Sequence, residues 1–395
     1  MRIASRMDHI GTETAFEAGA RARALEAQGR SVIHLEIGEP DFDTPANIRA
    51  AGKKALDDGW THYGPYFGLP ALREAIAEDA TRRKEFPVSP EHVVVTPGAK
   101  AIMYYAMLAL VEAGDEVIVP DPGYPIYESM ARFAGGTPVA LPVRQEHEFR
   151  ADLDELEALV TKKTRMIVLN SPANPTGGLF TREDVVRIAE LALRHDLVVL
   201  TDEIYGRIVY EGEHVSIASI PGMAERTIVL DGFSKTYAMT GWRLGYAILP
   251  DVLLYPYGRL IINSVSCTAS FSQIAAVEAL RGPQDAVDAM VEEFRARREL
   301  IVDGLNAIPG VRCLKPHAAF YVFPDFSATG LDGAELADRL LHEAGVCVLG
   351  GTAFGGVGRN HIRISYANSR ENLLEALRRI RATVEPLIAA HAGQA

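Results

Sequence analysis

The stretch Arg165–Tyr205, RMIVLNSPANPTGGLFTREDVVRIAELALRHDLVVLTDEIY, decides the fold of this chain. Two short apolar runs stand at its ends, with a turn rich in proline and glycine and an amphipathic segment between them. Thr181 and Asp184 form a capping-box pattern, which predicts a helix beginning at Thr181. Both runs are apolar throughout instead of alternating, which is typical of parallel strands buried on both faces. The stretch therefore predicts a strand–helix–strand unit of an α/β protein.

Similar runs on both sides of this unit extend it into a larger sheet. They are His92–Thr96, Glu116–Pro120, Thr227–Leu230 and Leu244–Leu249. An apolar helix is expected from about Ala99 to a left-handed C-cap at Gly114. The predicted fold class is α/β, with a large domain whose mostly parallel sheet is sandwiched by helices.

A smaller α+β domain is expected in the last third of the chain, where the pattern changes. The expected elements are a long charged helix, two short strands and a closing helix, at Asp285–Ile308, Ala319–Phe323, His361–Ser365 and from about Arg370. We expect residues 46–280 to form the large domain, and residues 1–45 and 281–395 to form the N-terminal segment and the small domain.

Composition excludes several classes of protein. The chain has 395 residues, 48% of them hydrophobic and 23% charged, which is typical of a soluble globular protein. A net charge of −12 argues against nucleic acid as a partner. The longest apolar run, Ala101–Ala113, is shorter than the ~20 residues of a membrane-spanning helix. Three scattered cysteines and dispersed histidines predict neither disulfides nor a metal site. We expect a cytoplasmic protein.

Four polar motifs follow predicted strands at their carboxyl ends, where open α/β sheets bind ligands. The motifs are Gly98-Ala99-Lys100, Asn174-Pro175-Thr176-Gly177, Asp202-Glu203-Ile204-Tyr205 and Ser234-Lys235. Each motif alone is also explained as a turn, a helix cap or a solvated lysine. Their occurrence at one edge of the same sheet favours a binding site.

The residue types in these motifs suit one kind of chemistry. Burial would favour the neutral amine of Lys235, which can then form a Schiff base with an aldehyde. If the aldehyde is carried by a pyridine ring, a carboxylate such as Asp202 can keep the ring nitrogen protonated, so that the ring withdraws electrons from the Schiff base. Asn174 and Tyr205 can donate hydrogen bonds to a phenolic oxygen, and Tyr124 is placed to stack on a ring.

The same edge of the sheet offers donors for an anion. Gly98 and Ala99 would open a helix whose free amides point outward. Ser234 supplies a hydroxyl, and Arg243 can form a charge-assisted bidentate pair. Lys100 is unfavourable in a first helical turn, but a bound anion would compensate its charge.

The run Ser234–Tyr246, SKTYAMTGWRLGY, resembles the lysine signature of the class I/II aminotransferases that depend on pyridoxal phosphate, in the fold-type I, aspartate-aminotransferase-like superfamily. Five more motifs occur in the family's order and at plausible spacings, so the resemblance covers essentially the whole chain. They are IGEPDF (37–42), YGPYFGLPAL (63–72), NPTG (174–177), DEIY (202–205) and HIRISYA (361–367). The chain departs from the pattern in GAK, where a second glycine is common, and in PGYPIY, where some members have tryptophan.

The resemblance implies a role for each matched residue. Lys235 would hold pyridoxal 5'-phosphate as an internal aldimine and move the proton at the substrate α-carbon. Asp202 would pair with the pyridine nitrogen, Asn174 and Tyr205 would contact the phenolic oxygen, and Tyr124 would stack on the ring. The phosphate region would be held by Gly98, Ala99, Lys100, Ser234 and Arg243.

The resemblance also implies the substrate contacts. Arg363 would clamp the substrate α-carboxylate, which a planar guanidinium binds bidentately. Gly38 and Asn174 would line the same region. Tyr63 would reach the phosphate of a neighbouring subunit, which implies a homodimer with shared active sites.

The implied reaction is transfer of an amino group from an L-amino acid to a 2-oxo acid by a ping-pong mechanism. Dicarboxylates are one candidate substrate class because Lys100 could meet a distal carboxylate, and alanine, aromatic or specialised amino acids are others. A lyase, cyclase, decarboxylase or oxidase with the same cofactor is the alternative, because fold and cofactor do not fix the reaction. A non-catalytic regulator that binds the same cofactor is a third alternative. Such a protein would be expected to carry a basic DNA-binding region, and the net charge of −12 argues against it.

Overall fold

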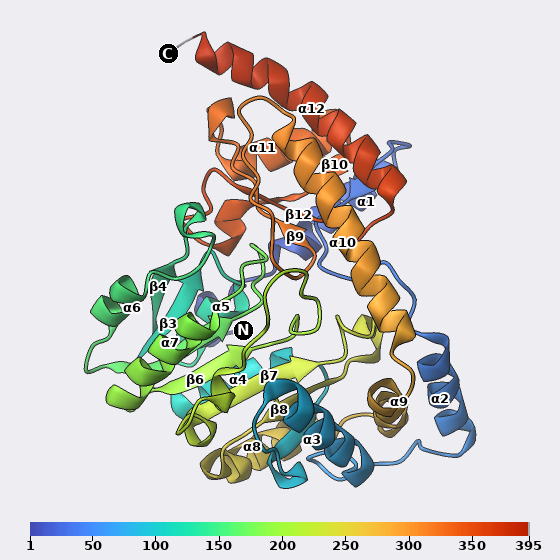
Figure 1. The fold of residues 1–395 in the computed structure, drawn as a ribbon, viewed down its shortest axis with the longest axis vertical. Helices are drawn as coiled ribbons and strands as arrows, with labels where there is room; N and C mark the ends of the chain where they lie inside the picture. The colour runs from blue at the N-terminus through green and yellow to red at the C-terminus, as the bar shows by residue number, and fades with distance from the viewer. Residues whose placement is uncertain (394–395) are drawn as a thin grey trace.

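The computed structural model describes residues 1–393 and is built around a seven-stranded sheet (Figure 1). In spatial order its strands are β2 (Val93–Thr96), β8 (Gly245–Ile248), β7 (Thr227–Gly232), β6 (Val198–Asp202), β5 (Thr164–Asn170), β3 (Glu116–Asp121) and β4 (Thr137–Pro142). The strands from β7 to β4 are parallel to one another, and β8 is antiparallel to both of its neighbours. The expectation of a mostly parallel sheet is confirmed.

Helices cover both faces of this sheet. One face carries α4 (Lys100–Leu110), α5 (Ile126–Phe133) and α8 (Asp251–Ser264). The other carries α3 (Pro70–Lys84), α6 (Leu153–Leu159), α7 (Arg182–Arg194) and α9 (Ser270–Arg281). In β5, Met166 and Val168 pack in the core on the α4 side, whereas Ile167 and Leu169 pack in the core that contains α7. This two-sided burial explains the continuous apolar runs in the sequence.

Local signals in the sequence have mixed outcomes. The capping box is confirmed, because the Asp184 amide donates to the Thr181 hydroxyl and the Thr181 amide donates to the Asp184 carboxylate. The expected helix end at Gly114 is wrong. Helix α4 ends at Leu110, and Gly114, with φ +102°, belongs to a separate turn that leads into β3. Strand β4 gave no signal because it is a half-exposed edge strand containing two prolines.

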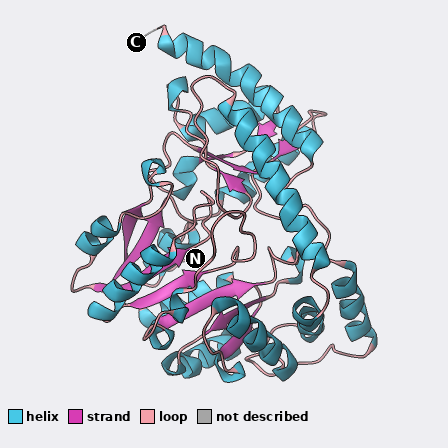
Figure 2. Cartoon of the chain, viewed as in Figure 1, coloured by secondary structure: helices cyan, strands magenta, loops and turns pink. Residues whose placement is uncertain are grey.

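A smaller sheet lies beside the carboxyl ends of the parallel strands, and Figure 2 shows the strands gathered in these two places. Its antiparallel strands are β11 (Leu349–Gly350), β12 (Ile362–Ser365) and β9 (Tyr321–Val322). The expected strand Ala319–Phe323 is shortened to β9, because Ala319 has a left-handed backbone with φ +59°. The helices of this part are α10 (Asp285–Asn306), α11 (Gly333–Arg339) and α12 (Arg370–Ala392).

The N-terminal segment joins this smaller part of the molecule. Strand β1 (Ile33–His34) pairs in parallel with β10 (Val346–Cys347), and α1 (Thr14–Glu26) precedes it. Helix α2 (Ala46–Asp57) packs instead on α9. The expected domain boundaries at residues 45 and 280 remain a prediction. None of the helices described is long and apolar enough to cross a membrane.

Candidate active site

A pocket of about 520 Å³ lies where the parallel strands end and face the smaller sheet. It brings together most of the residues that the sequence singled out, which come from separate strands and loops. Those lining it are Gly38, Ala99, Lys100, Tyr124, Asn174, Asp202, Tyr205, Ser234, Lys235, Arg243 and Arg363. Gly98 adjoins Ala99 at the beginning of α4. Tyr63 does not line the pocket and is 89% exposed.

Asp202, at the end of β6, is a buried carboxylate. One oxygen accepts a hydrogen bond of 2.7 Å from the Tyr127 hydroxyl, and the other accepts one of 3.1 Å from the Ile204 amide. Burial, together with nearby Asp231 and Glu203, raises the pKa of Asp202 to about 6. A cationic group bound beside Asp202 would favour its ionised form.

Lys235 lies in the turn after β7, where its amine reaches the pocket and donates to the Gly38 carbonyl oxygen. Burial lowers the pKa of Lys235 to about 8, and the nearby cations Arg363 and Arg243 act in the same direction while Glu39 opposes them. A substantial fraction of this amine is therefore neutral near physiological pH, as a nucleophilic amine requires.

A group of hydrogen-bond donors suited to an anion, which we call the anion cradle, lies at the beginning of α4, a helix that has no side-chain N-cap. Gly98 has φ +85°, and a Cβ on it would collide with the guanidinium of Arg243. Arg243 therefore lies directly against the glycine that opens the helix, while Ser234 lines the same pocket. Free amides, a hydroxyl and a guanidinium are together suited to a phosphate group.

Arg363 projects from β12 and is buried. Its Nη1 donates to Asn174 Oδ1 at 3.2 Å and its Nη2 donates to the Glu36 carbonyl, while Nε has no partner in the described part of the chain. The Tyr321 ring lies 4.7 Å from the guanidinium carbon, and burial lowers the pKa of Arg363. A buried guanidinium with a free donor is suited to a carboxylate ligand.

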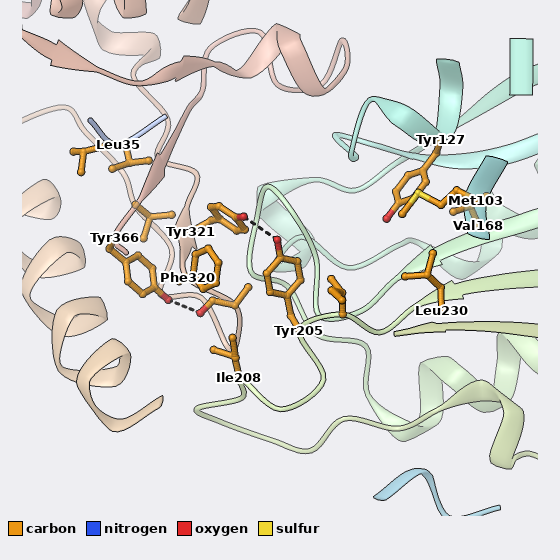
Figure 3. Close-up of a cluster of buried hydrophobic side chains, with 14 of the residues drawn as sticks. Leu35, Met103, Tyr127, Val168, Tyr205, Ile208, Leu230, Phe320, Tyr321 and Tyr366 are labelled. Atoms are coloured by element: carbon orange, nitrogen blue, oxygen red, sulfur yellow. Dashed lines mark hydrogen bonds between the residues drawn. The ribbon is translucent and has the colours of Figure 1, made fainter. Parts of the chain in front are cut away.

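Gly38 is required by close packing at this point. A Cβ there would overlap the Tyr321 hydroxyl. That hydroxyl is also 2.8 Å from the hydroxyl of Tyr205, and Figure 3 shows the two tyrosines pointing toward one another. The pair joins the end of β6 to the smaller sheet at the pocket wall.

Several pocket residues were missed by sequence analysis. Tyr127 could have been found, because it belongs to the same PGYPIY turn as Tyr124. Tyr321 lies in an expected strand, but nothing in the sequence aims it at Tyr205. Glu13 and Phe16 line the pocket from the N-terminal segment, whose path across the molecule no local pattern indicates.

Behind the pocket, Lys84 connects the two strands that carry Asp202 and Lys235. Its ammonium, 1% exposed, lies 2.6 Å from a Glu203 carboxylate oxygen and 2.9 Å from a carboxylate oxygen of Asp231. Burial opposes the ionisation of Glu203, but Lys84 and His214 lower its pKa overall. The ion pairs therefore hold β6 and β7 together directly beneath the site.

No cluster of three potential metal ligands occurs among residues 1–393. The chemical groups that converge on the pocket are an amine with a lowered pKa, a buried carboxylate, an anion cradle and a buried guanidinium. Such a set can hold a phosphorylated aldehyde together with a carboxylate substrate.

Comparison with known proteins identifies the family. Residues 30–380 match the model of the family described as aminotransferase class I and II. The chain is 43% identical to aspartate aminotransferase of Pyrococcus abyssi, covering 90% of this chain and 92% of that protein. It is 42% identical to aromatic-amino-acid aminotransferase 2 of Thermococcus litoralis, again covering 90% of this chain and 92% of the relative.

A solved structure agrees with these matches. Aspartate aminotransferase from Thermus thermophilus with maleate superposes with a TM-score of 0.92 at 39% identity, covering 97% of this chain and 100% of the other. The fold is therefore that of the fold-type I aminotransferases. The chain belongs to the aminotransferase class I and II family and is an enzyme, a transaminase.

Proposed function

We propose that the pocket binds pyridoxal 5'-phosphate on Lys235 and transfers an amino group between an L-amino acid and a 2-oxo acid by a ping-pong mechanism. The observation that carries the proposal is the lowered pKa of Lys235, about 8, in a pocket that also holds the buried Asp202 carboxylate. An aldehyde suits the amine, and a pyridine nitrogen suits the carboxylate. The phosphate suits the helix opening beside Gly98 and Arg243.

When bound, the cofactor supplies an electron sink for the bond broken at the α-carbon. Asp202 holds a proton on the ring nitrogen, and the Tyr127 hydrogen bond fixes the direction of its carboxylate. The Lys235 amine would take the proton from the substrate α-carbon and pass it to the bound cofactor within the first half-reaction, and it would move a proton in the opposite direction in the second. Tyr205 and Asn174, which line the same pocket, would donate hydrogen bonds to the phenolic oxygen, and Tyr124 would contact the ring.

Arg363 orients the substrate in this proposal. Its free Nε and its Nη1 are donors for an α-carboxylate, and the aromatic rings beside it keep the guanidinium dry. Because every amino acid and every 2-oxo acid carries this carboxylate, one clamp serves both half-reactions. Lys100, at the same pocket, is the cation available to a second carboxylate in a dicarboxylate such as aspartate.

Transamination is favoured over a lyase, cyclase, decarboxylase or oxidase reaction. Relatives at 42–43% identity are named aspartate, aromatic-amino-acid and aspartate/prephenate aminotransferases and an arginine–pyruvate transaminase. These names differ in substrate, so they support the reaction type and leave aspartate-type and aromatic substrates as candidates for this chain.

A homodimer with shared active sites is part of the proposal. Large apolar side chains are exposed on α8 and in the segment before α3, among them Tyr63, Val252, Tyr255 and Ile262. Gly258 of α8 lies against the Tyr66 ring, so the two segments form one face. Exposed apolar surface of this kind favours association. Tyr63 would then reach the phosphate cradle of the other subunit.

The free cysteines suit the reducing cytoplasm, which stays our expected location.

A spectral screen of the first half-reaction tests the function. The enzyme loaded with pyridoxal phosphate is mixed with each amino acid in turn, and loss of the visible absorbance is followed together with formation of the 2-oxo acid. We expect stoichiometric 2-oxo acid from at least one amino acid, and none from the Lys235→Ala variant. Release of free ammonia, with or without a 2-oxo acid, or of carbon dioxide would contradict transamination, because in transamination the amino group stays on the enzyme.

A further inference from the structure

The pocket contains an ion pair that the proposed mechanism does not use. Glu13, the residue before α1, contacts the Lys100 ammonium through its carboxylate. The same oxygen accepts a hydrogen bond of 3.1 Å from the Tyr124 hydroxyl. Glu13 is 17% exposed and Lys100 45% exposed, so the pair is partly screened from water. Among the described residues, Glu13 is the acidic group paired with Lys100.

The N-terminal segment surrounds Lys100 on more than one side. The Phe16 ring centroid lies 5.9 Å from the Lys100 nitrogen, and the Tyr124 ring centroid lies at 5.8 Å. Ala15, Ile37 and Met103 add apolar surface to the same pocket. Burial lowers the pKa of Lys100, and nearby Arg243 acts in the same direction. The Lys100 cation is therefore paired with one carboxylate, and its other neighbours in the pocket are apolar and aromatic groups and the Arg243 guanidinium.

Two classes of substrate meet this arrangement differently. A second carboxylate on the substrate gains full attraction from Lys100 only if it displaces Glu13, and it is repelled while Glu13 remains. A neutral apolar or aromatic side chain can pack against Phe16 and Tyr124 with the ion pair intact. The free-energy difference between the two classes therefore depends on Glu13.

We propose that Glu13 is a specificity-determining residue that competes with the distal carboxylate of a dicarboxylate substrate for Lys100, and so shifts preference toward neutral apolar and aromatic amino acids. The inference rests on the proposed function and names the substrate class of the same pocket. It makes the N-terminal segment, in addition to the sheet edge, part of the substrate site.

Binding of unreactive analogues to the holoenzyme tests the competition without turnover. Calorimetric titration would compare succinate, a dicarboxylate, with 3-phenylpropionate, a monocarboxylate with an aromatic end. We expect Glu13→Gln to tighten succinate about three- to fivefold, the upper end of the range for an exposed ion pair, and to change 3-phenylpropionate by less than about twofold. The ratio of kcat/KM for aspartate to that for phenylalanine should rise by the same factor.

Two variants show whether the effect runs through Lys100. Glu17→Gln removes the same charge from α1 at a residue that does not line the pocket, and it should leave both titrations unchanged. In a Lys100→Met background, Glu13→Gln should tighten succinate by no more than about twofold, because there is no cation left to release. An equal gain in both backgrounds would overturn the competition.

The outcomes separate this inference from the proposed function. An active wild-type enzyme whose substrate ratio and succinate affinity do not respond to Glu13→Gln contradicts the inference alone. A holoenzyme that forms no 2-oxo acid from any amino acid contradicts the proposed function. Equal tightening of both analogues would show that Glu13 restricts entry to the pocket, which also overturns the inference.

Discussion

Lys235 and Asp202 are both buried, and in both burial favours the uncharged form. For Lys235 this lowers the pKa and yields a neutral amine, and for Asp202 it raises the pKa and works against the carboxylate. The free protein therefore keeps its amine reactive and its carboxylate in an unfavourable setting. A cationic ring beside Asp202 would relieve that setting, because an opposite charge favours the ionised carboxylate.

The reactivity of the Lys235 amine should depend on pH. With a pKa of about 8, about a quarter of this amine is neutral at pH 7.5, against about one in a thousand for an ordinary lysine. The rate at which the cofactor-free enzyme captures pyridoxal phosphate, trapped with borohydride, should rise with pH and level off above pH 8. A rate still rising steeply at pH 10 would contradict it, and Lys235→Ala is the control.

The same pKa predicts a stability trend for the cofactor-free enzyme. The pKa of Lys235 is about 8 in the folded protein, against 10.5 for the ordinary group. Between these values the unfolded chain binds more protons than the folded one, so the contribution of Lys235 to stability rises with pH across this window. Comparing the urea unfolding of wild type and Lys235→Met from pH 7 to pH 10 would isolate this contribution. A difference that stays constant with pH would contradict the shifted pKa.

Asp202→Asn should separate stability from activity. The folded carboxyl, with its pKa of about 6, binds more protons than the unfolded one between pH 3.8 and about 6, so its contribution to stability falls as the pH rises through this window. Without cofactor, the variant should be more stable than wild type at pH 8, by up to about 3 kcal/mol, and the gain should shrink by pH 5. Its transamination rate should fall by about 100-fold or more. Thermal unfolding and the half-reaction assay measure the two effects.

At the scale of elements, helix α3 and strands β6 and β7 are joined by one buried cation. Lys84 is the last residue of α3 and lies between carboxylates carried by the loop after β6 and by β7. Removing one member of a buried ionic group costs more than the group contributes, because charge is left without a partner.

Lys84→Met should therefore destabilise the protein by about 3 kcal/mol or more, because Glu203 and Asp231 would keep their charges with only His214 at 3.1 Å and Arg83 at 3.7 Å beside them. Lys54→Met is the matched control, since its partner Asp58 and Lys54 itself are largely exposed and the pair contributes about 0.5 kcal/mol or less. Chemical unfolding measures both. Equal stability of the two variants would show that the buried carboxylates find other partners.

The helices and strands show which parts of the fold could be predicted from the sequence. Continuous apolar runs identified β5 and β6 because burial on both faces requires them, and the capping box marked α7 because it is a local hydrogen-bond pattern. The motifs at strand ends likewise predicted the positions of Lys235 and Asp202. The positions of Lys84 behind the pocket and of Glu13 beside Lys100 were not predictable, because each depends on segments far apart in the chain.

At the scale of the whole molecule, exposed apolar side chains of α8 and of the segment before α3 form the face on which we propose that a second subunit packs. A subunit-mixing experiment tests shared active sites. Tyr63→Ala and Lys235→Ala should each impair the enzyme when pure, the second completely. Mixed dimers would then contain one site with both native residues and should regain up to about half of the wild-type activity per mixed dimer. Recovery at no mixing ratio would contradict a site built from two chains.

The pairing of β1 with β10 has a consequence for synthesis on the ribosome. All seven strands of the large sheet lie between residues 93 and 248, whereas β1 finds its neighbour only when residues 346 and 347 have emerged. The N-terminal segment, which includes Glu13, therefore has an unpaired strand β1 during synthesis, at a stage when all strands of the large sheet are already available to fold. A circular permutation that brings β1 and β10 close together in the sequence would let them pair soon after synthesis. This change should raise the yield of folded enzyme at high temperature.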